Sequence, residues 1–123
     1  MENEGVRGFR DLRVWQQAID LVEQVYRLTE RFPDREMYGL AVQLRRAAVS
    51  VPSNIAEGHT RQHIKEYLNH LSIAQGSLAE IETQLEIAFR LKFIPTDSHQ
   101  ALLTQVTSLP KQLYALRNSL SHP

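Results

Sequence analysis

The sequence has 123 residues, of which 42% are hydrophobic and 23% are charged, so it is expected to form one folded domain rather than a disordered chain. It contains no cysteine, which excludes disulfide bonds, thiolate metal sites and cysteine nucleophiles. Its formal net charge is zero, which argues against a strong polyanion binder, yet eleven of its fourteen basic residues are arginine, the residue suited to fixed contacts with anions.

The first residues of the chain are polar and contain two glycines, so residues 1–8 are predicted to be flexible. This acidic start does not have the pattern of a signal peptide. No apolar run approaches the roughly 20 residues needed to span a bilayer. The sequence therefore predicts a cytoplasmic protein with no membrane partner.

A first helix is predicted from Asp11 to Phe32, because Pro33 disfavours helix at the residue before it. Its apolar side chains cover an arc of roughly 200°, about twice the apolar stripe of a surface helix. They include Val14, Trp15, Ala18 and Val25. A helix with so wide an apolar surface is predicted to contact more than its own chain, and self-association is the simplest explanation.

A second helix is predicted from after Asp34 to Gly58, with apolar residues at helical spacing throughout. Pro52 interrupts this pattern and removes one backbone hydrogen bond. A kinked but continuous helix is favoured over two separate helices. Gly58 is interpreted as a left-handed residue that stops the helix.

The third and fourth helices have the clearest pattern, because their apolar residues alternate steps of three and four. The third helix carries this seam from Ile64 to Ala88 and ends at residues 92–95. The fourth begins near Thr96, where Asp97 gives an acidic first turn.

The fourth helix is predicted to bend mildly at Pro110 and to fray, with residues 121–123 forming a loose tail. Short polar connections join all the helices, which favours antiparallel neighbours. The predicted fold is therefore an all-α, up-down-up-down four-helix bundle over residues 9–120.

One cluster of polar residues has spacings of four, three and four, which place its members on one helical face. These residues are His59, His63, Glu66 and His70. Imidazoles at such spacing bind zinc, but the alternative is a solvated polar face, because the sequence specifies no further ligand. The sequence has no serine-nucleophile motif and no glycine-rich phosphate loop, and Gly76 is interpreted as a point of close helix packing. It therefore predicts no enzyme, no cofactor, no resident metal and no small-molecule substrate.

Polar residues of the second helix allow two interpretations. Arg46 can form a partly buried ion pair with Glu57 or Glu80 that fixes the helix register. Alternatively, Arg45, Arg46 and Arg61 belong to a surface that contacts phosphates when several copies assemble. The sequence does not decide between these interpretations.

Three strings of the sequence resemble a bacterial four-helix-bundle family whose founding members are encoded in intervening sequences of large-subunit ribosomal RNA genes. The strings are FRDLRVWQQA, YGLAVQLRRAAVSVPSNIAEG and QGSLAEIETQLEIA. The resemblance covers about residues 9–94, with the fourth helix similar only in pattern. It implies homopentamers with a central channel. A related branch, the accessory variability determinant of diversity-generating retroelements, is basic, binds nucleic acid and partners a reverse transcriptase. The neutral charge of this chain departs from that branch and argues against such a partner.

Together these features predict a non-enzymatic homo-oligomer, pentameric by resemblance, that associates with RNA such as ribosomal RNA. The predicted nucleic-acid-binding residues are Arg10, Arg13, Arg45, Arg46 and Arg61. The predicted oligomer interface comprises Val14, Trp15, Ala18, Val25, Tyr38 and Asn54. The alternative is a protein-interaction scaffold that binds a partner protein and no nucleic acid. A metal-dependent enzyme built on the histidine face is the third hypothesis.

Overall fold

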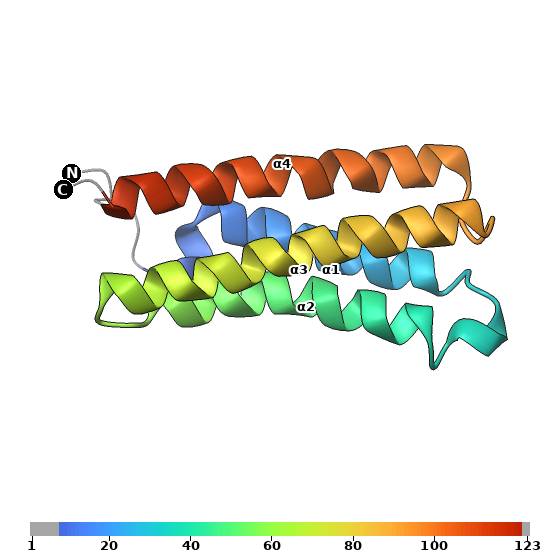
Figure 1. Cartoon of the computed structure of the whole chain (residues 1–123), viewed down its shortest axis with the longest axis horizontal. Coiled ribbons are helices and arrows are strands. Elements are labelled where there is room, and N and C mark those ends of the chain that lie inside the picture. Colours follow the sequence, from blue (N-terminus) through green and yellow to red (C-terminus); the bar gives the residue numbers. More distant parts are fainter. Residues whose placement is uncertain (1–7, 122–123) are drawn as a thin grey trace.

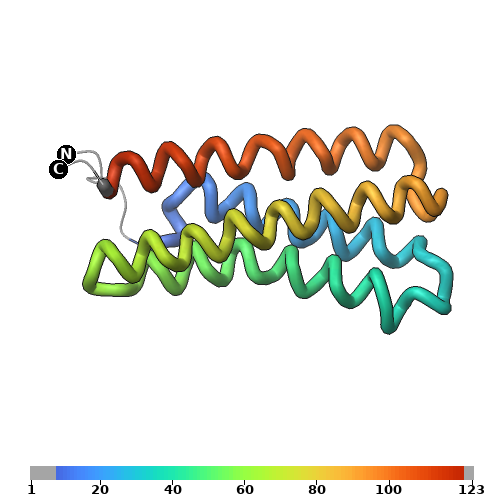
Figure 2. Tube along the Cα trace, viewed as in Figure 1, coloured from blue at the N-terminus to red at the C-terminus, as the bar shows by residue number. Residues whose placement is uncertain are grey.

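The computed structural model describes residues 8–121, and these form four α-helices with no strand among them. The helices are α1 (Arg13–Thr29), α2 (Leu40–His59), α3 (Ile64–Arg90) and α4 (Thr96–Ser121). Successive helices run in opposite directions along the long axis of the molecule (Figure 1 and Figure 2). The predicted all-α four-helix bundle is confirmed, and none of the helices described combines the length and apolarity that crossing a bilayer requires.

The first two helices begin later than the sequence predicts. Residues Phe9–Asp11 form a 3₁₀ turn and Leu12 is extended, so α1 starts at Arg13. A second 3₁₀ turn occupies Asp34–Glu36, and α2 starts only at Leu40. The backbone N–H of Leu40 donates to Glu36 Oε1 at 3.3 Å, so a side chain from the preceding turn satisfies one of the unpaired donors at the start of α2.

Helix α2 is continuous through Pro52, as favoured from the sequence. The bends expected at Pro52 and at Pro110, which lies inside α4, stay predictions. Helix α3 starts at Ile64, because residues 60–63 form the turn from α2.

The two interior glycines have the opposite of their predicted roles. Gly58 does not adopt a left-handed conformation; it is buried inside α2, where an added Cβ would stand 2.8 Å from His70 Cβ and 3.0 Å from Tyr67 Cδ1. The absence of a side chain there lets α2 approach α3 closely. Gly76 in α3 is exposed, with no atom within 4 Å of an added Cβ, so it has no packing role within the described chain.

The left-handed helix stop occurs instead at Lys92, with φ of 64°, after the end of α3. The N–H of Phe93 donates to the carbonyl of Ala88 at 2.9 Å and closes that end. Helix α4 extends to Ser121. Apart from Gly8 and Ser121, the loose segments predicted at residues 1–8 and 121–123 lie outside the described residues.

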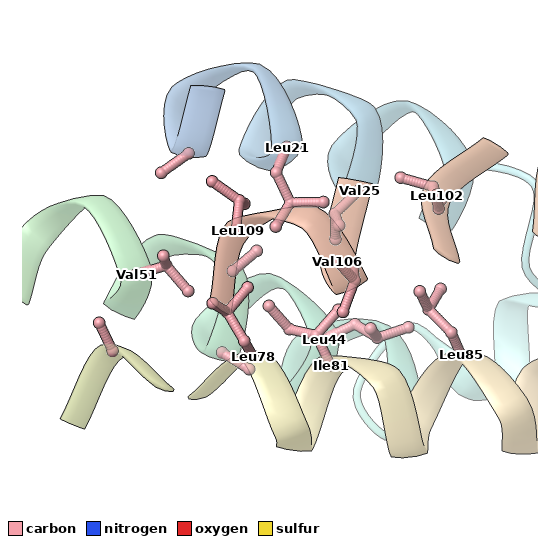
Figure 3. Packing of buried hydrophobic residues seen from close by; sticks show 14 of the residues in the cluster. Leu21, Val25, Leu44, Val51, Leu78, Ile81, Leu85, Leu102, Val106 and Leu109 are labelled. Atoms are coloured by element: carbon pink, nitrogen blue, oxygen red, sulfur yellow. The ribbon is translucent and has the colours of Figure 1, made fainter. Parts of the chain in front are cut away.

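All four helices contribute side chains to one core, which Figure 3 shows at its centre. Leucine, isoleucine and valine dominate it, in the steps of three and four that the sequence shows. The largest fully buried side chains are Leu21, Val25, Leu44, Val51, Ile55, Leu71, Leu78, Ile81, Leu85, Val106, Leu109 and Leu113. The core therefore runs along most of the bundle and fixes which helix faces remain at the surface.

Candidate nucleic-acid and self-association surfaces

Three residues predicted at an oligomer interface belong to the core of the single chain. Val14 is 6% exposed, and Ala18 and Val25 are fully buried on the inner face of α1. The prediction was wrong for these positions, because α2 and α4 cover the inner half of the wide apolar arc within the chain. Ala18 and Val25 have no accessible surface in the folded chain and cannot contact a second copy, and Val14 has almost none left for such a contact.

Trp15 lies at the edge of the same arc and is half-buried. Its ring centroid is 5.3 Å from that of Phe9, and the Arg10 guanidinium stands 5.5 Å from it. The segment before α1 thus folds over the outer side of the tryptophan, a contact that the periodicity of the helix cannot show. Trp15 has only a partial surface left for any contact with another molecule.

Tyr38 and Asn54 lie at the surface, as an interface requires. Tyr38, just before α2, is 96% exposed. Asn54 is half-buried in the seam between α2 and α3, where its Oδ1 accepts a hydrogen bond from His70 Nδ1 at 3.0 Å and its Nδ2 donates to the Ser50 carbonyl at 2.8 Å. Whether either residue contacts a second copy stays a prediction.

Much of the exposed apolar surface lies away from α1. Val49 on α2 and Ile73 on α3 are 40% and 45% exposed. Ser77 Oγ donates to Ser50 Oγ at 2.8 Å across the seam, so Ile73, one turn from Ser77, lies on the side of α3 that holds this bond. Val49 points about 100° away from Ser50 around α2 and lines a hollow with Tyr26 of α1, so it lies on the side of α2 towards α1. We call the surface along the seam between α2 and α3 the α2–α3 face; it comprises Ser50, Asn54, Ile73, Gly76 and Ser77.

Two arginines of the predicted nucleic-acid set lie side by side in the sequence of α2 but differ in surroundings. Arg45 is half-buried; its Nε donates to Thr29 Oγ1 at 2.8 Å, and its guanidinium lies 4.9 Å from the centroid of the Tyr26 ring. Arg46 is exposed and makes no hydrogen bond or ion pair within the described residues. The predicted pairing of Arg46 with an acidic residue is therefore wrong.

The acidic residues proposed as partners of Arg46 are engaged elsewhere. Glu57 Oε1 accepts from Arg61 Nη2 at 2.7 Å, because these residues are one turn apart. Glu80 Oε2 accepts from Gln84 Nε2 at 3.1 Å. Gln84 Nε2 also lies 3.3 Å from Gln43 Oε1, so neutral amides rather than an ion pair connect α2 with α3 at this level.

The five predicted arginines do not form one cluster. Arg10 lies in the 3₁₀ turn before α1 and Arg13 at the start of α1. Arg45 and Arg46 lie in the first half of α2, and Arg61 lies in the connection from α2 to α3. The start of α1 and that connection lie at the same end of the bundle, which is also where α4 ends (Figure 1). Arg13 and Arg61 are exposed there.

The four residues of the predicted histidine face do not converge. His59 Nδ1 lies 3.1 Å from the Tyr67 hydroxyl, and His70 bonds Asn54, so these two imidazoles make hydrogen bonds between α2 and α3. His63 is exposed at the start of α3. Within residues 8–121 no three His, Asp or Glu side chains approach closely enough to hold a metal ion. Burial raises the pKa of Tyr67 to about 12.

Two cationic residues that the sequence did not single out lie near Arg61. Lys65 is exposed in the first turn of α3, and Arg117 in α4 donates through Nη1 to the Leu68 carbonyl at 2.9 Å and to Ser72 Oγ at 2.6 Å. Arg117 is far from Arg61 in the sequence, so only the antiparallel packing of α3 and α4 brings them together. No local sequence motif predicts this proximity.

A family model described as the 23S rRNA-intervening sequence protein matches residues 10–115. The chain belongs to this family. The match confirms the resemblance seen in the sequence and extends it over most of α4, which the three strings alone did not cover.

A solved structure from Bacteroides thetaiotaomicron, a protein of unknown function from the S23 ribosomal protein family, has the same fold as this 23S rRNA-intervening sequence protein family member. The two chains superpose with a TM-score of 0.77 at 20% sequence identity, over 85% of this chain and 97% of the other. At that identity the likeness concerns the fold alone. No curated protein matches the sequence.

Proposed function

We propose that this family member is a non-enzymatic homo-oligomeric bundle, assembled as a pentamer, that binds structured RNA through exposed arginines. Ribosomal RNA is the first candidate, since the family is described by its 23S rRNA intervening sequences. The observation that carries the proposal is that several arginines have no carboxylate partner. Within residues 8–121, Arg10, Arg13, Arg45 and Arg46 have no carboxylate partner, whereas Arg27 and Arg90 pair with glutamates one turn away.

An arginine without a carboxylate partner is a better phosphate ligand, because no ion pair has to be broken before binding. The planar guanidinium then donates two parallel hydrogen bonds to a phosphate. Because the net charge of the chain is zero, attraction at long range is weak and binding depends on these local contacts. Assembly of several copies multiplies the contacts and raises the affinity for one RNA.

Fluorescence anisotropy with labelled 23S ribosomal RNA fragments tests the proposal. We expect binding at about 50 mM salt that weakens steeply as salt is raised, because the contacts release counterions. Arg46→Glu should weaken binding more than Arg27→Glu, since both substitutions reverse an exposed charge but only Arg27 is paired with a glutamate. Unchanged anisotropy at low salt, or equal effects of the two substitutions, would contradict RNA binding by these arginines.

Self-association is supported by the α2–α3 face. Ile73, its exposed apolar side chain, lies three residues before Gly76 in α3, and the missing side chain of Gly76 leaves room for a close approach by another molecule. A glycine in the middle of a helix costs about 0.5–1 kcal/mol relative to alanine, and no contact within the described chain offsets this cost. Size exclusion with light scattering should give about five times the chain mass of 14.2 kDa.

The second candidate function is a protein-interaction scaffold without nucleic-acid binding. The observation in its favour is the set of large apolar side chains that stay exposed on several helices, among them Tyr26, Val49, Ile73, Ile87 and Tyr114. A single partner protein that co-purifies in fixed stoichiometry, and stays bound after nuclease treatment, would favour this candidate over RNA binding.

A further inference from the structure

A hollow of about 510 Å³ lies between α1 and α2, and its volume is in the range of small-molecule sites. From α1 it is lined by Tyr26, and from α2 by a single stripe of residues. The stripe consists of Val42, Arg45, Arg46, Val49 and Ser50. These positions follow steps of three and four, so they share one face of α2 over about two helical turns. We call this site the α1–α2 hollow.

Two arginines and no carboxylate line the α1–α2 hollow. Arg46 is exposed and makes no hydrogen bond or ion pair within the described residues. Arg45 donates through Nε to Thr29 Oγ1 at 2.8 Å, and its two terminal amino groups have no hydrogen-bond partner within residues 8–121. One guanidinium is therefore held in place with its outer donors unused, and the other is free to meet a ligand.

The carboxylates of α1 that are closest in sequence to Tyr26 form no ion pair with these arginines. Glu23 lies one turn before Tyr26 and pairs with Arg27 at 3.4 Å. Glu30 lies one turn after Tyr26 and pairs with no basic side chain of the described residues. Neither glutamate lines the hollow. The positive charge of the hollow is therefore not matched within the chain, and it attracts an anion from solution.

Tyr26 provides an aromatic surface beside this charge. The Arg45 guanidinium lies 4.9 Å from the centroid of the Tyr26 ring, and Tyr26 is still 42% exposed. The cation holds the ring in position, and the accessible part of the ring remains available to a planar group. Val49, which is 40% exposed, adds an apolar wall. A ligand suited to this hollow combines a planar ring with an anionic group.

A nucleotide of an unpaired RNA segment has both of these parts. Unpaired bases stack on aromatic side chains and arginine planes, whereas the bases of a duplex are already stacked on one another. An acidic peptide would meet the arginines but would leave the tyrosine ring without a planar partner. We propose that the α1–α2 hollow binds one unpaired nucleotide, with its base against Tyr26 and Val49 and its phosphate on Arg45 and Arg46. This inference rests on the proposed RNA binding and assigns the contact to loops, bulges or single strands.

NMR of the full chain, titrated with a short single-stranded oligoadenylate, tests the site directly. We expect saturable upfield shifts of the Val49 methyl signals and the Tyr26 ring signals, because the ring current of a stacked adenine shields nearby protons. The same oligoadenylate annealed to oligouridylate has its bases paired and should shift these signals much less. The comparison separates recognition of a base from attraction to phosphates, which both forms of RNA carry.

Substitutions of exposed tyrosines measure the contribution of the ring. Tyr26→Ala should weaken the affinity for the single strand about fivefold or more, since it removes a base–aromatic contact. Tyr26→Phe keeps the ring and should bind like the natural chain. Tyr114→Ala is the matched control, because Tyr114 is 63% exposed on α4 and does not line the hollow. Circular dichroism of all three variants checks that the helices stay folded.

Equal effects of Tyr26→Ala and Tyr114→Ala, or equal shifts with paired and unpaired strands, would overturn the site and leave RNA binding by the arginines standing. Absence of binding to every RNA, ribosomal fragments included, would refute the proposed function together with the site. Shifts of the Tyr26 and Val49 signals with oligoglutamate, and none with oligoadenylate, would overturn the nucleotide site and assign the hollow to an acidic protein partner.

Discussion

The Tyr67 hydroxyl shows how burial of a single polar group makes stability depend on pH. In the unfolded chain a tyrosine ionises near pH 10, whereas burial raises the pKa of Tyr67 to about 12 in the folded chain. The folded state therefore favours the neutral phenol. This contribution to stability is complete below about pH 10 and is lost as pH rises towards about 12.

We expect the free energy of unfolding to fall between about pH 10 and 12, and to fall less steeply in Tyr67→Phe, which has no hydroxyl to ionise. Denaturant unfolding of both proteins across this range measures the difference. The phenylalanine variant also loses the bond to His59, so its stability at neutral pH serves as the baseline for its own curve. Equal slopes for the two proteins would show that folding does not raise the pKa of Tyr67.

Substitution of Gly58 tests how tightly α2 packs against α3 at a single position. An alanine Cβ there would stand 2.8 Å from His70 Cβ and 3.3 Å from the Tyr67 carbonyl oxygen. Neither atom is the end of a flexible side chain, so the helices themselves must separate. We expect Gly58→Ala to destabilise the fold by about 1–3 kcal/mol, measured by thermal or denaturant unfolding. A neutral effect would mean that the helices separate at no cost.

At the scale of whole helices, the sequence predicts the fold because the apolar spacing is a property of each helix. The seam from Ile64 to Ala88 identified α3 and its buried face without any knowledge of its neighbours. Helix starts were less accurate, since the 3₁₀ turn at Asp34–Glu36 and the hydrogen bond that Glu36 accepts from the Leu40 N–H precede α2 and are not encoded in the apolar periodicity. The glycine roles were reversed, because only the packed pair of helices shows what stands beside each Cα.

The candidate site was less predictable than the helices. The sequence left open whether Arg46 is exposed to solvent or paired with an acidic side chain, and in the structure it is exposed. Lys65 and Arg117 were missed, because their proximity depends on how α3 and α4 pack. Val14 and Val25 were assigned to an interface because a wide apolar arc does not say which part of it the chain itself covers.

Gly76 allows a prediction about α3 as an element. Its position is exposed and an added Cβ meets no atom within 4 Å, so alanine should fit without strain. In an isolated chain Gly76→Ala should stabilise the fold by about 0.5–1 kcal/mol, because alanine loses less conformational freedom in a helix. Unfolding measured at concentrations where the protein is monomeric checks this, with Gly58→Ala as the destabilising counterpart. Destabilisation of the monomer would contradict the open surroundings of Gly76.

The molecule as a whole has a covered core, exposed arginines at one end and an α2–α3 face with one large exposed apolar side chain, and the proposed assembly assigns a different role to each. The core residues of α1 hold the chain together, so they are unavailable to a second copy. Arg13 lies at the start of α1, at one end of the bundle, whereas Ile73 lies further along α3. Contact between copies through the α2–α3 face would therefore leave the arginines at this end open to RNA.

A charge placed on the α2–α3 face should separate the copies. Ile73→Glu puts a carboxylate on the exposed apolar part of this face, which a monomer tolerates but a buried contact does not, since an unpaired buried charge costs several kcal/mol. We expect light scattering to show a lower mass for this variant with unchanged helix content by circular dichroism. Val49→Glu, on the side of α2 towards α1, and Tyr114→Glu, on α4, also charge exposed apolar positions and should keep the mass of the natural chain. Loss of assembly with one of these two variants alone would move the contact to its face, and an assembly unaffected by Ile73→Glu would exclude the α2–α3 face.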